Sequence, residues 1–320
     1  MKSETPLKAA VFFDTRPGHR KQTLGILDSL EQLTEIQTIQ IKLPHLSAKS
    51  EILKWIKYFI YPAKNCSADL EGCDFIIGTG SRTHIPMLAC SKKYHIPVIT
   101  CMAPTAILRA KFDLCFVPLH DCIQAANNIF LTDGPPNRSR SKGLHDPNRG
   151  LILIGGKDEK SHHWNDTAII NSVSVLLQQE RNLTWTISSS PRTPAETNTS
   201  LENLAVKFDN AHFIKFSDTG PGWIEKEYDK NKTVWVTADS VSMLFEARSA
   251  GCRVGVLPIT WKRKNNKFQR CVDDLCTKEL VVSFDAWKEG KARCAFSEPL
   301  NEAQRCAREI LKRWWPNRLQ

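Results

Sequence analysis

Residues that could hold a diphosphate follow apolar segments in the second half of the chain. The segment 234–259, VWVTADSVSMLFEARSAGCRVGVLPI, predicts a strand, a polar turn, a helix that ends at Gly251 and a second strand. Parallel α/β sheets bind ligands at the carboxyl ends of their strands, where helix N-termini direct N–H groups toward anions. The turn 239–242 therefore lies where such a sheet would hold a phosphate group.

Two glycines and several cations in the same half suit the same ligand. Gly155 and Gly156 allow the backbone to approach a ligand closely, and Lys157 and Lys160 carry charge that complements phosphate. Arg192 follows the next predicted strand, and its planar guanidinium matches a diphosphate in a bidentate manner. We therefore predict a phosphate site built from turns that follow successive strands.

Ser240, Ser242 and Glu246 are compatible with two roles. The serines suit the N-cap of a helix, where a hydroxyl oxygen accepts an N–H bond, and Glu246 would then be a solvated helix residue. Alternatively, Glu246 lies one turn along the same helix face as Ser242 and accepts hydrogen bonds from a ribose diol. The shared position of these residues and the glycine turn at strand ends favours a phosphate-plus-ribose site.

A repeated strand–turn–helix pattern predicts parallel sheets. The predicted strands are 9–13, 36–43, 73–80 with its glycine turn, 97–101, 112–118, 151–154, 183–188, 212–216, 234–236, 254–258 and 280–284. The stretch 133–150 is rich in Pro, Gly, Ser, Asn and Arg and predicts a linker. The fold class is therefore α/β, with two tandem Rossmann-like doubly wound sheets and a cleft between them. We expect domains at 1–140 and 141–300, and a helix within 301–320 that packs back on the first domain.

Length and composition agree with this organisation. A chain of 320 residues suits two domains, and 41% hydrophobic with 24% charged residues is typical of a soluble protein. The net charge of +10 implies an acidic partner, such as a nucleotide or an anionic membrane surface. We find no motif of a specific nucleic-acid binder, no secretory signal and no apolar run of the ~20 residues that span a bilayer. We therefore expect a cytoplasmic protein.

The segment 50–62, SEILKWIKYFIYP, is apolar and aromatic around most of a helix. Packing against the domain core is the favoured interpretation. The alternative is that Trp55–Tyr61 docks on a membrane, where aromatic rings and lysines suit the interface. In that case the protein would associate peripherally with the inner face of a membrane.

Cysteine and histidine spacing does not indicate a metal site. The 11 cysteines include no Cys-x-x-Cys pair, and we expect buried, reduced thiols in a cytosolic protein. His162 and His163 lie on a predicted loop, and adjacent histidines rarely converge on one ion, so we expect both to be solvated. We expect no metal, and no cofactor apart from a donor substrate.

Several motifs together resemble one family. They are D-x-R-P-G-H-x-x-Q-x-L-G from Asp14 to Gly25, IGTGSRT at 77–83, FDLCFVPLHD at 112–121, the Gly155-Gly156 turn with Trp164, the SPRTP turn after Ser189, and VTADSVSM followed by Glu246. This set resembles the elongated-mitochondria fission family, whose bacterial members are similar to glycosyltransferases of the GT-B fold. The resemblance covers nearly the whole chain.

The resemblance implies a GT-B-like arrangement, with the acceptor on the N-terminal domain and a nucleotide-sugar on the C-terminal one. The resulting donor-site candidates are Gly155, Gly156, Lys157, Ser190, Arg192, Ser240, Ser242, Met243 and Glu246. Sugar transfer also needs a base that deprotonates the acceptor hydroxyl.

His19 is the best candidate for this base, because an imidazole with an unperturbed pKa of about 6.5 accepts protons at neutral pH. Asp14 or Asp121 could orient His19 or replace it, and Arg16 or Arg20 could contact an acidic acceptor. The alternative is that His19 only bonds to backbone near a helix N-terminus.

Two functions are compatible with these features. One is a metal-independent glycosyltransferase that uses a nucleotide-sugar donor and a cell-envelope glycan or lipid acceptor. The other is a non-catalytic adaptor that keeps the scaffold and recruits a protein partner, as the fission role of plant relatives implies. Arg192 and Glu246 favour the transferase. The chain has no dinucleotide fingerprint, which disfavours an epimerase or a dehydrogenase.

Overall fold

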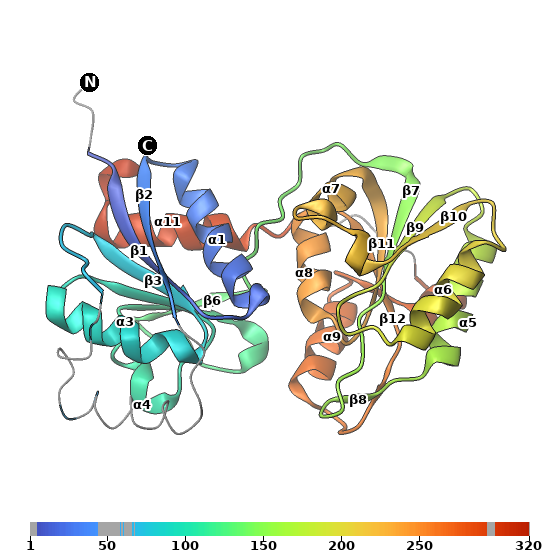
Figure 1. Cartoon of the computed structure of the whole chain (residues 1–320), viewed down its shortest axis with the longest axis horizontal. Coiled ribbons are helices and arrows are strands. Elements are labelled where there is room, and N and C mark those ends of the chain that lie inside the picture. The colour runs from blue at the N-terminus through green and yellow to red at the C-terminus, as the bar shows by residue number, and fades with distance from the viewer. Residues whose placement is uncertain are drawn as a thin grey trace. The chain divides into compact units, whose positions relative to one another are not determined.

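The chain forms two compact units, each built around its own parallel sheet (Figure 1). The computed structural model describes residues 5–43, 58, 60, 66, 68–292 and 298–319. Unit 1 contains Met1–Arg138 and Asn301–Gln320, and unit 2 contains Ser139–Leu300. The predicted α/β architecture with two tandem Rossmann-like sheets is confirmed. The cleft between them stays a prediction.

Unit 1 contains a six-stranded sheet in the order β2-β1-β3-β4-β5-β6. All neighbouring strands in it run parallel. Its strands are β1 (Leu7–Phe13), β2 (Ile36–Lys42), β3 (Phe75–Thr79), β4 (Val98–Cys101), β5 (Leu114–Pro118) and β6 (Ile129–Thr132). Its helices are α1 (Pro17–Glu31), α3 (Ser81–Tyr94), α4 (Ala106–Arg109), α11 (Glu302–Trp314) and the short η2 (Leu119–Asp121) and η4 (Pro316–Arg318).

Both faces of this sheet are covered, as alternating side chains of β1 show. Val11 belongs to an apolar cluster that includes residues of α1 and α11, whereas Phe12 belongs to a second cluster with residues of α3. Successive strand side chains point to opposite faces, so a strand buried on both sides reads as a continuous apolar run. This is why the sequence at 9–13 contains no polar residue.

Unit 2 repeats the architecture with the order β10-β9-β7-β11-β12-β14. Its strands are β7 (Asp146–Leu153), β9 (Thr184–Ser188), β10 (Ala211–Ile214), β11 (Asn231–Thr237), β12 (Arg253–Leu257) and β14 (Val282–Ser283), and a separate antiparallel pair joins β8 (His162–His163) to β13 (Thr260–Trp261). Its helices are α5 (Asp166–Gln179), α6 (Ala195–Ala205), α7 (Trp223–Lys230), α8 (Val241–Ser249), α9 (Lys267–Thr277), α10 (Phe284–Lys288) and the short η3 (Phe216–Asp218).

The structure differs from the sequence-based expectation in several local elements. The predicted linker 133–150 contains the start of β7, because Asp146 pairs with Asn231 before a register shift. Helices α7 and α9 were not predicted because their sequences are mostly polar, and α9 buries only a narrow stripe that contains Cys271, Val272 and Leu275. Most of the segment Trp55–Tyr61 lies outside the described residues.

The expectation of reduced thiols throughout the chain is wrong at one pair. Cys66 and Cys90 form a disulfide, with their Cα atoms 4.7 Å apart. Cys90 is buried in α3, and the two residues are separated by 24 positions in the sequence. Their spacing matches no local motif, and only the packing of α3 brings them together.

We predict that Gly150→Ala destabilises the protein, because a Cβ atom on this residue of β7 would collide with the indole of Trp185. Trp185 is fully buried and cannot move into solvent. Overpacking of this kind typically costs about 1–3 kcal/mol, which a shift in the urea midpoint would reveal. Gly220→Ala is the control, since nothing lies within 4 Å of a Cβ there. Equal midpoints for the two variants would contradict the prediction.

Candidate functional site

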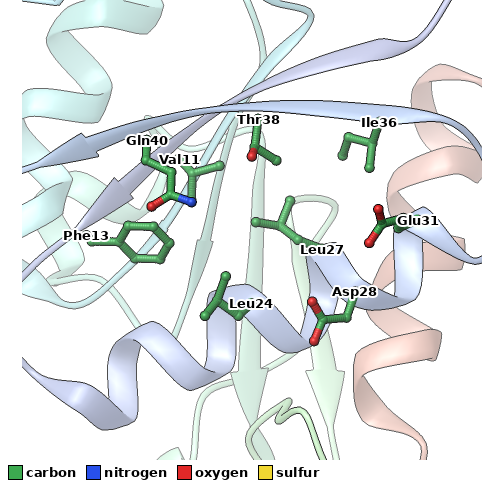
Figure 2. A pocket seen from close by; sticks show the side chains of 9 residues that line it. All are labelled: Val11, Phe13, Leu24, Leu27, Asp28, Glu31, Ile36, Thr38 and Gln40. Carbon is green, nitrogen blue, oxygen red and sulfur yellow. The ribbon is translucent and has the colours of Figure 1, made fainter. Parts of the chain in front are cut away.

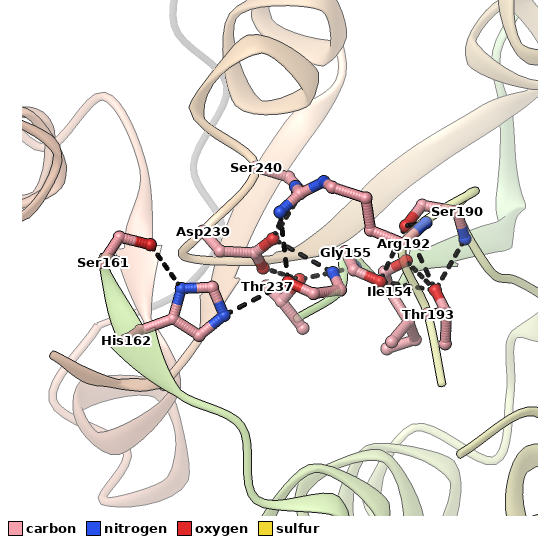
Figure 3. Close-up of polar contacts among 11 residues, drawn as sticks. Ile154, Gly155, Ser161, His162, Ser190, Arg192, Thr193, Thr237, Asp239 and Ser240 are labelled. Carbon is pink, nitrogen blue, oxygen red and sulfur yellow. Dashed lines mark hydrogen bonds and ion pairs between the residues drawn. The ribbon is translucent and has the colours of Figure 1, made fainter. Parts of the chain in front are cut away.

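Three turns of unit 2 meet where β9, β7 and β11 end, because these strands are consecutive in the sheet (Figure 3). Gly155 and Gly156 follow β7, Arg192 follows β9, and Asp239 follows Thr237 at the end of β11. We call these five residues the glycine–arginine cluster. The sequence predicted that the glycines and Arg192 belong together, and hydrogen bonds connect them here.

Asp239 is the centre of this cluster, and its side chain is only 2% exposed. One carboxylate oxygen accepts hydrogen bonds from the Gly156 N–H at 3.1 Å, Arg192 Nη2 at 2.9 Å and the Ser240 hydroxyl at 3.2 Å. The other accepts from the Thr237 hydroxyl at 2.7 Å. A carboxylate has about four acceptor positions, so these partners satisfy it. The sequence pattern indicated only a turn at Asp239 and gave no sign of this central role.

The two glycines are required by close contacts within the cluster. A Cβ atom at Gly155 would overlap the Asp239 carboxylate, and one at Gly156 would overlap the backbone of Arg192. The Gly155 N–H donates to the Thr237 hydroxyl at 2.7 Å, and the Gly156 N–H donates to Asp239. Both N–H groups therefore have internal acceptors, and these glycines shape the turn around a carboxylate of the protein itself.

Arg192 is held in one orientation by two partners. Its Nη1 donates to the Gly156 carbonyl at 3.1 Å, and its Nη2 donates to Asp239. The side chain is still 46% exposed. Each terminal nitrogen carries two N–H groups, so the guanidinium can bind a phosphate oxygen while both internal contacts stay in place.

His162 contradicts the prediction that both adjacent histidines are solvated. It is 1% exposed, and its Nε2 lies 3.1 Å from the Gly156 carbonyl, which fixes this nitrogen as the donor. Its Nδ1 lies 2.8 Å from the Ser161 hydroxyl. Successive residues of the paired strands β8 and β13 point to opposite sides. His162 therefore supports the glycine turn, while His163 is exposed.

The remaining predicted residues next to the cluster differ in their environment. Ser190 donates from its hydroxyl to the Gly155 carbonyl at 2.8 Å, and the Thr193 hydroxyl donates to the same oxygen. The ammonium of Lys157 lies 3.4 Å from the Glu159 carboxylate, and Lys160 is exposed. Ser190 is thus a structural part of the turn, whereas the lysines lie on its surface.

The N-terminus of α8 is the part of the site that offers positive potential to a ligand. Ser240 occupies the N-cap position, but its hydroxyl donates to Asp239 and makes no cap hydrogen bond, and the first turn contains no acidic residue. Ser242 is exposed, Met243 is half-buried, and Glu246 is 8% exposed and therefore not a solvated residue. A helix end without a side-chain cap favours binding of an anion.

In unit 1, the predicted base candidate is paired with a carboxylate. His19 Nδ1 lies 2.7 Å from Asp14 Oδ2, and the two side chains are 12% and 2% exposed. The carboxylate also accepts the Arg16 N–H at 2.9 Å. Because an ionised carboxylate only accepts, Nδ1 carries the proton and Nε2 is the nitrogen that can take one from a substrate. The Gly80 backbone passes close above this pair, since a Cβ there would lie 2.8 Å from Asp14.

Asp121 lies at the same edge of the sheet but on a different strand connection. It is in η2 after β5, and β3 and β4 lie between β5 and β1. Three strand spacings of about 4.8 Å place it roughly 14 Å from the end of β1. The structure thus pairs Asp14 with His19, whereas Asp121 follows a strand that lies three positions from β1 in the sheet.

His84, which no sequence motif indicated, is a buried residue of α3 near the same edge. It is 3% exposed, its Nε2 lies 3.5 Å from the Thr100 hydroxyl, and its Nδ1 has no hydrogen-bond partner among the described residues. Burial lowers the pKa of His84 to about 4, and the charge of His19 acts in the same direction. A single histidine in the first turn of a helix gives no signal in the sequence that it is buried.

A separate pocket between α1 and β2 is too small for a nucleotide-sugar (Figure 2). Its volume is about 140 Å³, whereas ligand pockets usually measure ~300–1,000 Å³. Its lining mixes apolar and polar side chains and includes two carboxylates: Val11, Phe13, Leu24, Leu27, Asp28, Glu31, Ile36, Thr38 and Gln40. One of these carboxylates, Asp28, already forms an ion pair with Arg138.

In the described part of the chain, no group of three or more His, Cys, Asp or Glu side chains is placed to hold a metal ion. Within the same residues, no helix combines the length and the apolar character needed to cross a bilayer.

Comparison with known proteins identified one family and several similar folds. The family described as "Mitochondrial fission ELM1" matches residues 17–314. A search of curated protein sequences found no match. Among solved structures, S. aureus MnaA in complex with UDP is 15% identical, with 98% of each chain covered and a TM-score of 0.55.

Two further structures represent an epimerase and a glycosyltransferase. The Methanocaldococcus jannaschii UDP-GlcNAc 2-epimerase, in complex with UDP-GlcNAc and UDP, is 13% identical over 96% of this chain and 100% of its own, with a TM-score of 0.51. CalG4, the calicheamicin glycosyltransferase, is 10% identical over 98% and 96%, also with a TM-score of 0.51. At these identities the similarity shows the fold alone, which is the GT-B-like one that the resemblance implied.

We predict that Asp239→Ala lowers the free energy of unfolding by about 3 kcal/mol, because it leaves Arg192 and buried donors without their acceptor. Asp209→Ala removes an exposed carboxylate and should change stability by less than about 0.5 kcal/mol. Urea denaturation of both variants measures the difference. A small effect at Asp239 would show that it does not organise the cluster.

We also predict a pH-dependent stability term from His84. Its pKa falls from 6.5 in the unfolded chain to about 4 in the folded protein, so the unfolded chain binds the proton first as pH decreases. The stabilising term is therefore complete above pH 6.5 and is lost as pH falls toward about 4, by at most about 3 kcal/mol.

Urea unfolding of wild type and His84→Gln between pH 7 and 4 tests this term. The wild type should lose more stability than the variant across this range, and the exposed His163→Gln control should follow the wild type. Parallel curves for wild type and His84→Gln would refute the assignment.

Proposed function

The chain belongs to the mitochondrial fission ELM1 family, and we propose that it is a metal-independent, GT-B-type glycosyltransferase that uses a nucleotide-sugar donor. One observation carries this proposal. The N-terminus of α8 has no side-chain cap and no acidic residue in its first turn. It lies directly after the Asp239 turn, and the Asp239 carboxylate pairs with the half-exposed Arg192. A diphosphate is the ligand whose charge and size suit a helix end beside a fixed guanidinium.

The ligand contacts follow from this placement. The diphosphate would accept N–H bonds from the first turn of α8 and from the exposed side of Arg192. Glu246, one turn further along α8, would accept hydrogen bonds from the ribose hydroxyls. The names of two similar structures include UDP or UDP-GlcNAc, so uridine nucleotides are the first to test.

For the chemical step we assign the base to His19. Its Nε2 would take the proton of the acceptor hydroxyl as the acceptor oxygen bonds to the anomeric carbon. The bond from that carbon to the diphosphate oxygen breaks at the same time, and its electron pair leaves with the nucleoside diphosphate. Asp14 fixes the tautomer and stabilises the imidazolium that forms. A cell-envelope glycan or lipid is the acceptor class we propose.

Two other functions compete with this proposal, each for a specific reason. Similar folds include a UDP-GlcNAc 2-epimerase, so the absence of a dinucleotide fingerprint excludes only epimerases that use a dinucleotide. An adaptor function is favoured by the internal pairing of Arg192 with Asp239, because this pair neutralises the charge that a diphosphate would otherwise meet. Product analysis distinguishes the epimerase from the transferase, and ligand binding distinguishes the adaptor from the transferase.

We predict that one nucleotide stabilises the wild-type protein in a thermal-shift screen of UDP, GDP, ADP and CMP. A ligand at a hundredfold excess over its Kd adds about 2.7 kcal/mol. Glu246→Gln should abolish the shift, whereas Glu202→Gln, an exposed glutamate of α6, should keep it. His19→Gln should keep the shift and lower sugar transfer by a factor of about 10²–10⁴.

Different failures of this experiment have different meanings. If no nucleotide shifts the wild type, the transferase proposal is abandoned in favour of the adaptor. If a nucleotide binds and the sugar is isomerised without transfer, the protein is an epimerase on the same fold.

A further inference from the structure

A cluster of cations follows β12 at the carboxyl edge of the sheet in unit 2. Residues 260–270 contain five Lys or Arg residues and no acidic residue. Lys and Arg are thus enriched in this segment, because the whole chain has 44 of them in 320 residues. We call this segment the basic loop. Its cations are all exposed: Lys262, Arg263, Lys264, Lys267 and Arg270. Lys160, which precedes β8, is a further exposed cation, and β8 pairs with β13 at the start of the loop.

The basic loop has a defined conformation. The Asn266 side chain caps α9 by accepting from the N–H groups of Phe268 and Gln269 at 2.9 and 3.0 Å. It also donates to the Arg263 carbonyl at 3.1 Å, and the Lys262 N–H donates to the Ser161 carbonyl at 3.0 Å. The cations are therefore presented by an ordered turn between β13 and α9.

The position of two of these cations opposes helix stability. Lys267 and Arg270 lie in the first turns of α9, where the helix dipole is positive and acidic residues are preferred. The first turn of α9 contains no acidic residue. Positive charge from side chains and from the helix end therefore adds up on one surface, an arrangement that costs stability and favours an anionic partner.

An exposed aromatic ring, that of Phe268, lies among the cations of the basic loop. Phe268 is 36% exposed, and the Lys267 ammonium lies 5.2 Å from its ring centroid. Carboxylates of the adjoining segments include Glu159, which is paired with Lys157, and Asp273 further along α9. An aromatic ring surrounded by lysines and arginines suits the interface of an anionic bilayer, where the ring enters the headgroup layer and the cations contact phosphates.

We propose that the basic loop and the N-terminus of α9 dock unit 2 on an anionic phospholipid membrane. A bilayer fits better than a nucleic acid because the surface offers one exposed ring, whereas single-stranded nucleic acids stack on several successive aromatic side chains. The residues of the basic loop are not among those proposed to bind the nucleotide, and the test of this surface needs no nucleotide. Failure of the docking proposal therefore leaves the proposed function unaffected.

Co-sedimentation with vesicles tests the proposal on the full chain. Wild type should bind phosphatidylcholine vesicles that contain 30% phosphatidylglycerol, and should not bind pure phosphatidylcholine. Raising the salt from 0.1 to 1 M should release it, because the Debye length falls from about 10 to about 3 Å. Binding that is equal on both vesicles would overturn the proposal.

A charge-reversal pair identifies the surface. Arg263→Glu with Lys264→Glu should weaken vesicle binding by roughly 30-fold or more, at about fivefold for each cation lost. The matched control is Arg181→Glu with Lys207→Glu, which makes the same charge change on exposed residues that precede β9 and β10. The control should bind like wild type, and equal losses in both variants would overturn the assignment to the basic loop.

Two further measurements separate membrane docking from misfolding and from nucleic-acid binding. Phe268→Ala should weaken vesicle binding by removing an apolar contact, whereas high salt weakens it by screening charge. An unchanged melting temperature would show that each variant is folded. A single-stranded DNA oligonucleotide serves as competitor. If it binds more tightly than the vesicles and Arg263→Glu with Lys264→Glu abolishes that binding, the surface is a nucleic-acid site and the membrane proposal is wrong.

Discussion

A buried carboxylate organises the carboxyl edge of unit 2. Removing an ionised side chain from water is costly unless hydrogen bonds replace its hydration. Asp239 receives these bonds from the turn after β7, from Arg192 after β9 and from the residues on either side of it in its own turn. Each of these loops therefore depends on the same charged group for its conformation, and the glycines are the residues that allow it to fit.

This arrangement limits what a ligand can do at the site. An incoming phosphate cannot take the place of Asp239 without leaving a buried charge unpaired, so it must bind beside the carboxylate. The group that remains available is the N-terminus of α8, where Ser240 donates to Asp239 and does not cap the helix. Asp239 thus offsets the positive charge of Arg192 but fixes the orientation of its guanidinium, which favours recognition of a ligand by its geometry over general attraction to anions.

The sequence predicted the architecture more fully than it predicted the contacts. Strands that are buried on both faces, such as 9–13, have continuous apolar sequences, so the sheets could be predicted. Polar turns follow these strands, so the position of Gly155 and Arg192 at the carboxyl edge of the second sheet could be predicted as well. The partnership of Gly156 with Asp239 spans 83 positions and depends on which strands are adjacent. Burial of His162 could not be predicted because a two-residue ladder has no periodicity to detect, and the polar sequence of α9 concealed a helix.

The two units contain similar pairs centred on an aspartate. In each, an aspartate that follows an interior strand pairs with a cationic or protonatable group and lies against a glycine: Asp14 pairs with His19 next to Gly80, and Asp239, which lies next to Gly155, pairs with Arg192. The difference lies in the partner. A guanidinium keeps its proton at every physiological pH, so the pair in unit 2 can only orient and attract. We propose the base in unit 1 because an imidazole has a nitrogen that can accept a proton.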